Sequence, residues 1–255
     1  MTAGGRVAPG ADGLEMHRVS SGAEADRPIR VARRRIVNTL WILAAAILAL
    51  GILHLAVIDS VADPDFKLYL NLLTLDGENV LPAWFSATMM SGAALVMLAA
   101  GLAARRNDPA NARAWVILAA IFVFLSLDEV VSIHERFAET LERFYDFDGI
   151  LTFSWVVVAA PLLVIAVVGF IPFLRRLPKP IGRRMAIAGF VFVLGAFGCE
   201  LIGGYIDGIH GRSFWYWVEV ICEEGLEMAG LVLVIGAVLD YLGLVAARLT
   251  LDFGD

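Results

Sequence analysis

The sequence has little cysteine and few stretches that could form a soluble domain. Cys199 and Cys222 are its only cysteines among 255 residues, which is too few to define a disulfide framework. The segments between its apolar runs are also too short to hold a separately folded unit. These absences exclude a disulfide-stapled scaffold and predict a single domain.

Apolar residues dominate the composition. The chain is 59% hydrophobic with a mean hydropathy of +0.76, whereas soluble domains are roughly 45–50% apolar. A helix that crosses a bilayer needs about 20 apolar residues, and six runs reach that length. They cover residues 36–58, 81–104, 114–135, 150–174, 184–206 and 214–242. The sequence therefore predicts an all-α integral membrane protein, a bundle of six transmembrane helices.

Basic residues are unevenly divided between the two sides of such a bundle. Sixteen of the 20 Lys and Arg residues lie in segments on one side: the N-terminal tail, residues 105–113, residues 175–184 and the C-terminal tail. The positive-inside rule then predicts that the N and C termini are cytoplasmic. We expect a multi-pass protein of the bacterial inner membrane. Its predicted parts are a disordered basic tail at 1–35, a six-span domain at 36–245 and a short cytoplasmic tail at 246–255.

The sixth apolar run carries four glutamates, Glu219, Glu223, Glu224 and Glu227. A carboxylate near the bilayer centre costs at least ~2.5 kcal/mol, so these side chains need something that neutralises them. At 100° per residue, Glu219, Glu223 and Glu227 lie within about 80° on one helix face, with Glu224 at its margin. This face is predicted to form one wall of a site.

Two other runs carry acids to a similar depth. Asp128 and Glu129 in the third run and Glu200 in the fifth lie about 9 Å below the outer surface, and the acids of the sixth run lie about 8 to 20 Å below it. No Lys or Arg accompanies these seven acids within the hydrocarbon. Neutralisation must then come from shared protons or from a metal ion, and we favour the metal.

The expected cofactor is a divalent metal ion, either Zn, Mn or Fe with mixed carboxylate and imidazole ligands, or Ca with carboxylates alone. The predicted ligands are Asp128, Glu129, His134, Glu135, Glu200, Glu219, Glu223 and Glu227. Secondary candidates just above them are His54, Asp76, Glu78, Asp207 and His210. The catalytic candidates are Glu129, Glu223 and Glu224.

One common metal signature is missing from the third run. Ferritin-like di-iron sites use Glu-x-x-His on one helix face, and no such pair occurs here. If the helix stays regular through residue 135, Asp128, Ser132 and Glu135 share a face and His134 points elsewhere.

Small residues in the fifth run recur at a spacing of four, at Gly195, Cys199 and Gly203. This spacing predicts that another helix approaches closely. The two thiols are expected to be small apolar fillers rather than ligands. The expected partners are membrane lipids and a second copy of the chain packed through small-residue helix faces, with no nucleic acid.

Three functions remain open. The first is a metal-dependent membrane enzyme acting on a lipid or on a small substrate at the outer face. The second is a cation or proton transporter that uses the glutamates as a relay, and the third is a sensory or scaffold protein with a structural metal. Haem ligation by His54 with His134 or His210 is a minor alternative. The inner half of the bundle is uncharged from Met228 to Leu239, which favours a one-sided, outward-facing pocket over a transport path.

Two stretches carry a resemblance, DGEN-x-x-PAWFS at Asp76–Ser86 and LSLDE-x-x-x-x-HE at Leu125–Glu135. In these two motifs the chain resembles a group of uncharacterised bacterial polytopic membrane proteins, and the resemblance spans most of the transmembrane region. The resemblance implies no known activity, but it supports a place for Asp76, Glu78 and His134 in the site. The several-His zinc pattern of alkaline-ceramidase-like hydrolases is not met.

Overall fold

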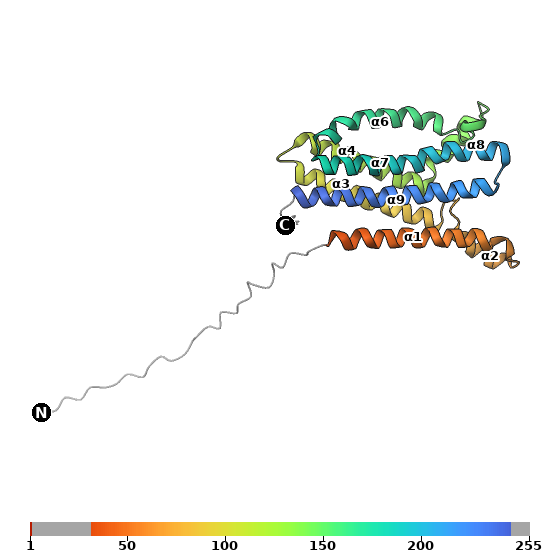
Figure 1. Ribbon diagram of the computed structural model, residues 1–255, viewed down its shortest axis with the longest axis horizontal. Coiled ribbons are helices and arrows are strands. Elements are labelled where there is room, and N and C mark those ends of the chain that lie inside the picture. The colour runs from red at the N-terminus through yellow and green to blue at the C-terminus, as the bar shows by residue number, and fades with distance from the viewer. Residues whose placement is uncertain (2–31, 246–255) are drawn as a thin grey trace. The chain divides into compact units, whose positions relative to one another are not determined.

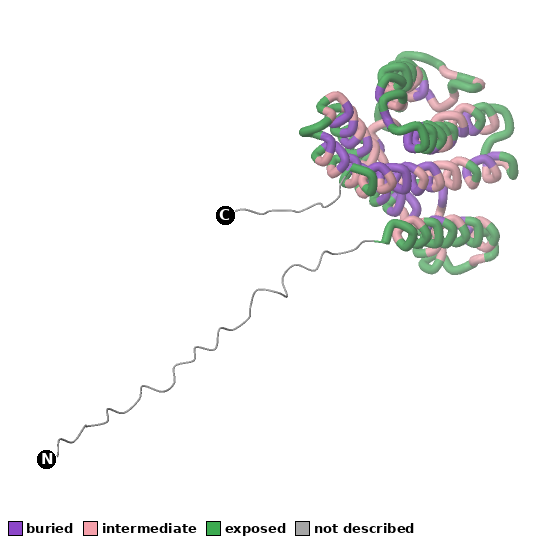
Figure 2. Tube along the Cα trace, turned by 60° about the vertical axis from the view of Figure 1, so that its left-hand side comes forward, coloured by how far each residue is buried: buried purple, intermediate pink, exposed green. Residues whose placement is uncertain are grey.

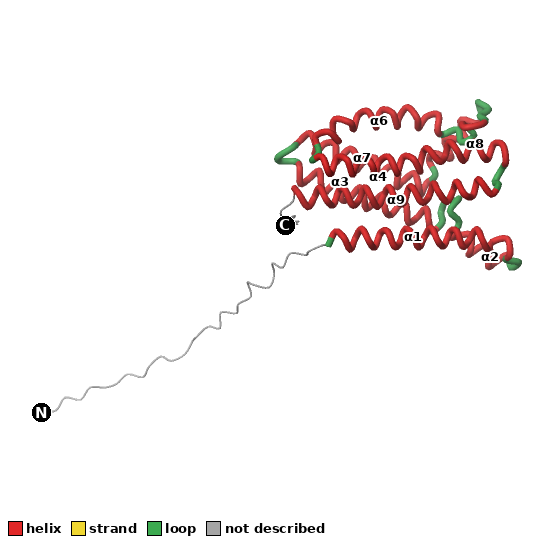
Figure 3. Tube along the Cα trace, in the orientation of Figure 1, coloured by secondary structure: helices red, strands yellow, loops and turns green. Residues whose placement is uncertain are grey.

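The computed structural model describes residues 32–245, together with Met1. In this part of the chain the regular elements are helices, and none is a strand (Figure 3). The structure of residues 2–31 and 246–255, where we predicted tails, lies outside the described residues. The first helix begins at Arg33, inside the last few residues of the predicted N-terminal tail.

Six helical segments are long and apolar enough to cross a membrane. They are α1 (Arg33–Val57), α3 (Leu81–Ala104), α4 (Pro109–Val131), α6 (Val156–Arg176), α7 (Lys179–Val193) with its continuation α8 (Glu200–His210), and α9 (Phe214–Val245) (Figure 1). A π-helical stretch, Leu194–Cys199, joins α7 to α8. The chain is therefore an all-α, multi-pass membrane protein, and the predicted bundle of six spans is confirmed.

Short helices connect these spans at the end of the bundle that carries the acids. They are α2 (Pro64–Leu70) and α5 (Ile133–Glu142), with 3-10 turns at Ile58–Ser60, Asn71–Leu73 and Gly149–Leu151. Asp63 caps α2 by accepting the backbone N–H of Asp65 at 3.0 Å. At the opposite end Asp108 caps α4 by accepting the N–H of Asn111 at 3.1 Å. Such caps satisfy helix N–H groups that have no partner within the helix.

Helix α9 is the central element of the bundle. It packs against α1, α3, α7 and the π-helical stretch, and its residues beyond Glu227 are mostly buried. The apolar core lies in the half of the bundle away from the acids, where Trp115 packs edge-on against Phe173 with ring centroids 4.9 Å apart. Fully buried members of this core include Met97, Met228, Leu231, Val232 and Val238. The acids therefore stand above an apolar floor.

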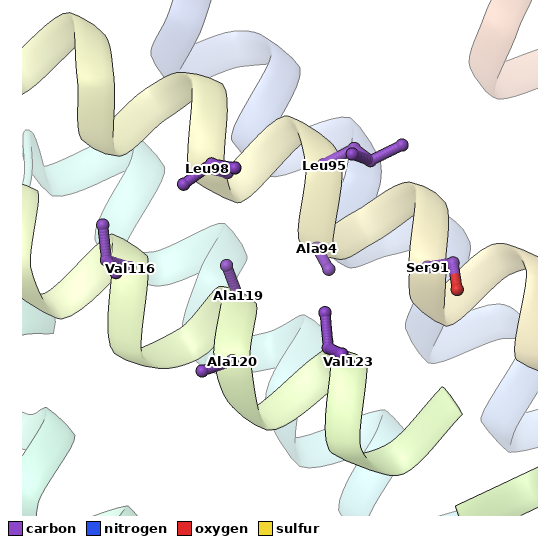
Figure 4. A pocket seen from close by; sticks show the side chains of 8 residues that line it. All are labelled: Ser91, Ala94, Leu95, Leu98, Val116, Ala119, Ala120 and Val123. Atoms are coloured by element: carbon purple, nitrogen blue, oxygen red, sulfur yellow. The ribbon is translucent and has the colours of Figure 1, made fainter. Parts of the chain in front are cut away.

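The outer helices present apolar side chains to their surroundings. Helix α1 is exposed along most of its length (Figure 2). Helices α3 and α4 leave between them an apolar groove of about 410 Å³, lined from Ser91 to Leu98 and from Val116 to Val123 (Figure 4). Exposed apolar surface of this extent is what a helix bundle presents to lipid tails.

Glycines let α9 approach its neighbours closely. A Cβ atom on Gly195 would lie 2.9 Å from the backbone nitrogen of Glu227, and one on Gly203 would lie 2.7 Å from Oε2 of Glu219. The close approach predicted from the stripe Gly195, Cys199 and Gly203 is confirmed, and α9 is the helix that approaches. At Gly230 a Cβ atom would lie 2.6 Å from the Cα of Phe192 on α7.

We predict that Gly230→Ala lowers the free energy of unfolding by about 1–3 kcal/mol, the usual cost of overpacking, because the added methyl group meets the α7 backbone. The matched control is Gly189→Ala on α7, where an added Cβ meets nothing within 4 Å. That change should be neutral or stabilising by up to ~1 kcal/mol. Unfolding in mixed detergent micelles, followed by tryptophan fluorescence, measures both. Equal stability of the two variants would contradict this packing.

Candidate functional site

The third span ends earlier than the sequence suggested. Helix α4 stops at Val131, and Ser132 adopts the left-handed conformation, with φ 55° and ψ 49°. Such a conformation is uncommon for a residue other than glycine, and it ends the regular helix. A separate helix, α5, begins at Ile133. The expectation of one continuous helix through residue 135 was therefore wrong, because the backbone changes direction at Ser132.

This turn brings His134 back onto Asp128. The backbone N–H of His134 donates to Oδ1 of Asp128 at 2.9 Å, and its ring Nδ1–H donates to Oδ2 at 2.9 Å. His134 thus faces the acid from which a regular helix would have turned it away. Burial by itself lowers the pKa of His134, but the hydrogen bond and the charge of Asp128 outweigh it, so the pKa is raised. Since Nδ1 is engaged, Nε2 is the ring atom available to a ligand.

Glu78 and Glu135 complete a group of three side chains with His134. One ligand atom from each lies within 4.8 Å of the other two. Burial, followed by the charge of Glu135, raises the pKa of Glu78. Its Oε2 atom is buried without a hydrogen-bond partner. Two carboxylates and one imidazole are a donor set that suits a divalent cation.

The loop that carries Glu78 is fixed from the other side of the site. Asp76 forms an ion pair with Arg212 at 2.9 Å, and the Arg212 guanidinium lies over the ring of Tyr216, 5.7 Å from its centroid. Leu75 is buried against Tyr216 on α9. These contacts tie the loop to the turn between α8 and α9 and so determine where Glu78 lies.

Glu200 enters the site from the fifth span through Trp155. It is the first residue after the π-helical stretch, and its Oε1 accepts a hydrogen bond from the indole Nε1–H of Trp155 at 3.2 Å. The Trp155 ring packs edge-on against His134, with centroids 5.3 Å apart. A π-helical turn shifts the face presented by the residues that follow, and such turns are frequent at functional sites. The indole thus connects Glu200 to the pair formed by Asp128 and His134.

The glutamates of α9 lie within electrostatic range of acids on two other spans. Glu224 and Glu227 lie within that range of Glu129, and Glu219, Glu223 and Glu227 lie within it of Glu200. Two of the α9 carboxylates have a buried oxygen without a hydrogen-bond partner, Oε1 of Glu219 and Oε2 of Glu224.

Glu219 is the most buried of these acids. It is 7% exposed, and its carboxylate lies directly against the bare backbone of Gly203. Within residues 32–245, however, the only three such side chains with ligand atoms this close together are Glu78, His134 and Glu135. The structure therefore brings the α9 acids near these three residues without placing them in one ligand group.

The remaining candidates lie outside this group. His54 is buried on α1, where its Nε2–H donates to Oδ1 of Asn71 at 3.3 Å. Asp207 is half-buried near the end of α8, and His210 is exposed at its last residue. Cys199 is buried beside α9, and Cys222 is exposed.

Sequence reasoning overlooked two residues that organise the site, Trp155 and Arg212. An aromatic residue near a span terminus is typical of the interfacial belt, and no spacing signal distinguishes Trp155 from the other belt aromatics. Arg212 is one of the four basic residues that lie outside the basic side of the predicted bundle. Nothing in the sequence pairs it with Asp76, because the ion pair depends on which loops meet.

A family model described as a domain of unknown function (DUF8692) matches residues 32–241. The match covers five of the spans and the sixth up to residue 241, together with the loop that carries Glu78 and the helix α5 that carries His134. No curated protein and no solved structure matches the chain.

We predict that His134 in the metal-free protein has a pKa above its ordinary value of 6.5 and that Asp128→Asn lowers it, because the paired carboxylate stabilises the imidazolium. A raised pKa in the folded state means that the pair stabilises the fold fully below pH 6.5. This contribution is lost as the pH rises through the raised value. Imidazole NMR shifts across a pH titration measure the pKa. An unchanged titration in Asp128→Asn would contradict the pairing.

Proposed function

This chain belongs to the family described as a domain of unknown function (DUF8692), and we propose that it binds a divalent metal ion through Glu78, His134 and Glu135. The observation that supports this proposal is the pairing of Asp128 with His134. Histidines that ligate metals usually donate their other ring N–H to a carboxylate, which fixes the ring and makes it a better donor. Asp128 is in that position, and Nε2 is left for the ion.

The ligand set also limits the choice of metal. Zinc, manganese and iron accept mixed carboxylate and imidazole ligands, whereas calcium prefers oxygen ligands alone. The imidazole of His134 therefore favours the first three. The unpartnered Oε2 of Glu78 supports a bound cation without selecting among these metals, since a buried carboxylate oxygen without a donor is costly unless a cation satisfies it.

We propose that the metal serves a membrane enzyme that acts on a lipid or on a small substrate at the outer face. A bound divalent ion would supply Lewis acidity to a substrate oxygen. Glu129 lies within electrostatic range of both Glu78 and His134 without belonging to the ligand group. It is therefore the leading candidate for a proton acceptor. Glu224 and Glu223 rank behind it, because the couplings found for them are with other acids and not with His134.

The apolar floor of the site favours this function over transport. Below Glu227, α9 carries no charged side chain until Asp240, and the buried residues between them pack against apolar side chains of α3, α4, α6 and α7. A cation or proton relay needs polar groups on both sides of the membrane at some stage of its cycle. The polar groups of this bundle stop at Glu227, which supports a site that opens on one side only.

We also propose that the acid-bearing end faces the periplasm or outside of a bacterial inner membrane and that both termini are cytoplasmic. The excess of Lys and Arg at the opposite end supports this orientation. Alkaline phosphatase fused after the last residue should be inactive, and a fluorescent protein fused there should fluoresce. An active phosphatase fusion would reverse the assignment.

The metal proposal predicts about one tightly bound divalent ion per chain. His134→Ala and Glu78→Gln should each abolish binding of the ion, because each removes a ligand. Asp128→Asn should weaken binding by about 10–100-fold, as loss of a carboxylate that holds a ligating histidine usually does. Elemental analysis after purification, followed by equilibrium dialysis with Zn and Mn, measures content and affinity. The matched control is Glu139→Gln, an exposed glutamate on α5, which should keep the ion.

Two outcomes would contradict the proposal. If the wild-type protein stayed metal-free after dialysis against both ions, the proposal of a metal site would be contradicted. Proteoliposomes that show protein-dependent flux of protons or divalent cations, lost in Glu227→Gln, would replace the one-sided site with a relay. A bound ion without flux supports the proposal as stated.

A further inference from the structure

A second groove lies at the basic end of the bundle, opposite the acids, between α4 and α6. It has a volume of about 320 Å³ and runs along one face of each helix. Its apolar lining includes the small residues Ala114, Ala166 and Gly169. A Cβ atom on Gly169 would meet nothing within 4 Å, so the space beside this glycine is open. Small side chains at the helix contact are thus what create the groove.

Two arginines line the same groove at its basic end, Arg113 on α4 and Arg176 on α6. Arg176 donates from Nε to Oδ1 of Asn111 at 3.0 Å, and the Asn111 side chain donates to Asp108 at 2.6 Å. These contacts orient Arg176 and leave its terminal guanidinium nitrogens for another acceptor. None of the ion pairs formed among residues 32–245 involves Arg113. The groove therefore combines an apolar channel with two positive charges at one end.

The length of the groove matches one leaflet of a bilayer. From Arg176 to Ala166 is ten helical residues, or about 15 Å, which is half of the roughly 30 Å thickness of the hydrocarbon. An occupant that follows the groove would place its charged end at the level of the arginines and its apolar end near the bilayer centre. A phospholipid of the surrounding leaflet has these dimensions and this polarity.

We propose that this groove binds one phospholipid with an anionic headgroup. Its phosphate lies between Arg113 and Arg176, and one acyl chain lies beside Gly169, Ala166 and Ala114. Basic pockets between transmembrane helices recognise anionic headgroups in this way. The site is separate from the candidate metal centre, because it lies at the other end of α4 and is lined by α4 and α6 alone.

Native mass spectrometry of the purified protein with added dioleoylphosphatidylglycerol tests the proposal, with dioleoylphosphatidylethanolamine as the neutral comparison. The wild type should retain one phosphatidylglycerol in clear preference to phosphatidylethanolamine. Arg113→Gln should weaken phosphatidylglycerol binding about five-fold, the factor that corresponds to ~1 kcal/mol per basic residue near an anionic lipid. Arg113 is exposed, so this variant should fold normally.

A second test of the lipid site is a variant whose added side chain fills the groove. Gly169→Leu should abolish retention of the lipid, whereas Gly189→Leu, which also adds a side chain to open space on a spanning helix, should leave it unchanged. Equal retention of the two lipids would overturn the proposal, as would retention of phosphatidylglycerol in Gly169→Leu at the wild-type level. Metal content should be the same in all these variants, so the result stands independently of the proposed function.

Discussion

A carboxylate placed in hydrocarbon needs a proton, a cation or a hydrogen-bond donor, and this constraint organises the acid-bearing end of the bundle. Asp128 meets it by accepting two hydrogen bonds from His134. Glu200 meets it through the indole of Trp155, and Asp76 through Arg212. Buried carboxylate oxygens without a hydrogen-bond donor remain on Glu78, Glu219 and Glu224, and of these three acids Glu78 belongs to the proposed ligand group.

Local departures from regular helix bring these groups together. The left-handed residue Ser132 ends α4 so that His134 meets Asp128, and the π-helical stretch Leu194–Cys199 precedes Glu200. Gly195 and Gly203 let α9 approach so closely that the Glu219 carboxylate touches bare backbone. Each of these features departs from regular, closely spaced helix geometry or depends on a missing side chain, and each occurs beside a residue of the candidate site.

The two ends of the bundle differ in their chemistry because the apolar core separates them. At one end carboxylates outnumber the cationic groups within reach, which suits a metal ion. At the other end Asp240 pairs with Arg33 and Arg184, and arginines remain on the walls of the groove between α4 and α6. Between the ends, Trp115, Phe173 and Leu231 form part of a buried apolar core, which separates the proposed cation site from the proposed anion site.

The sequence by itself determined the number of spans, and it predicted the depth of the acids and the face of α9 on which Glu219, Glu223 and Glu227 lie. Hydropathy and the helical period depend only on local residue order, so these features could be calculated without knowing which helices meet. The tertiary structure alone decided that Glu78 joins His134 and Glu135, because that group depends on the turn at Ser132 and on an ion pair between residues 136 positions apart, Asp76 and Arg212. No periodicity encodes a single left-handed residue or the pairing of distant loops, since both are set by packing across the bundle.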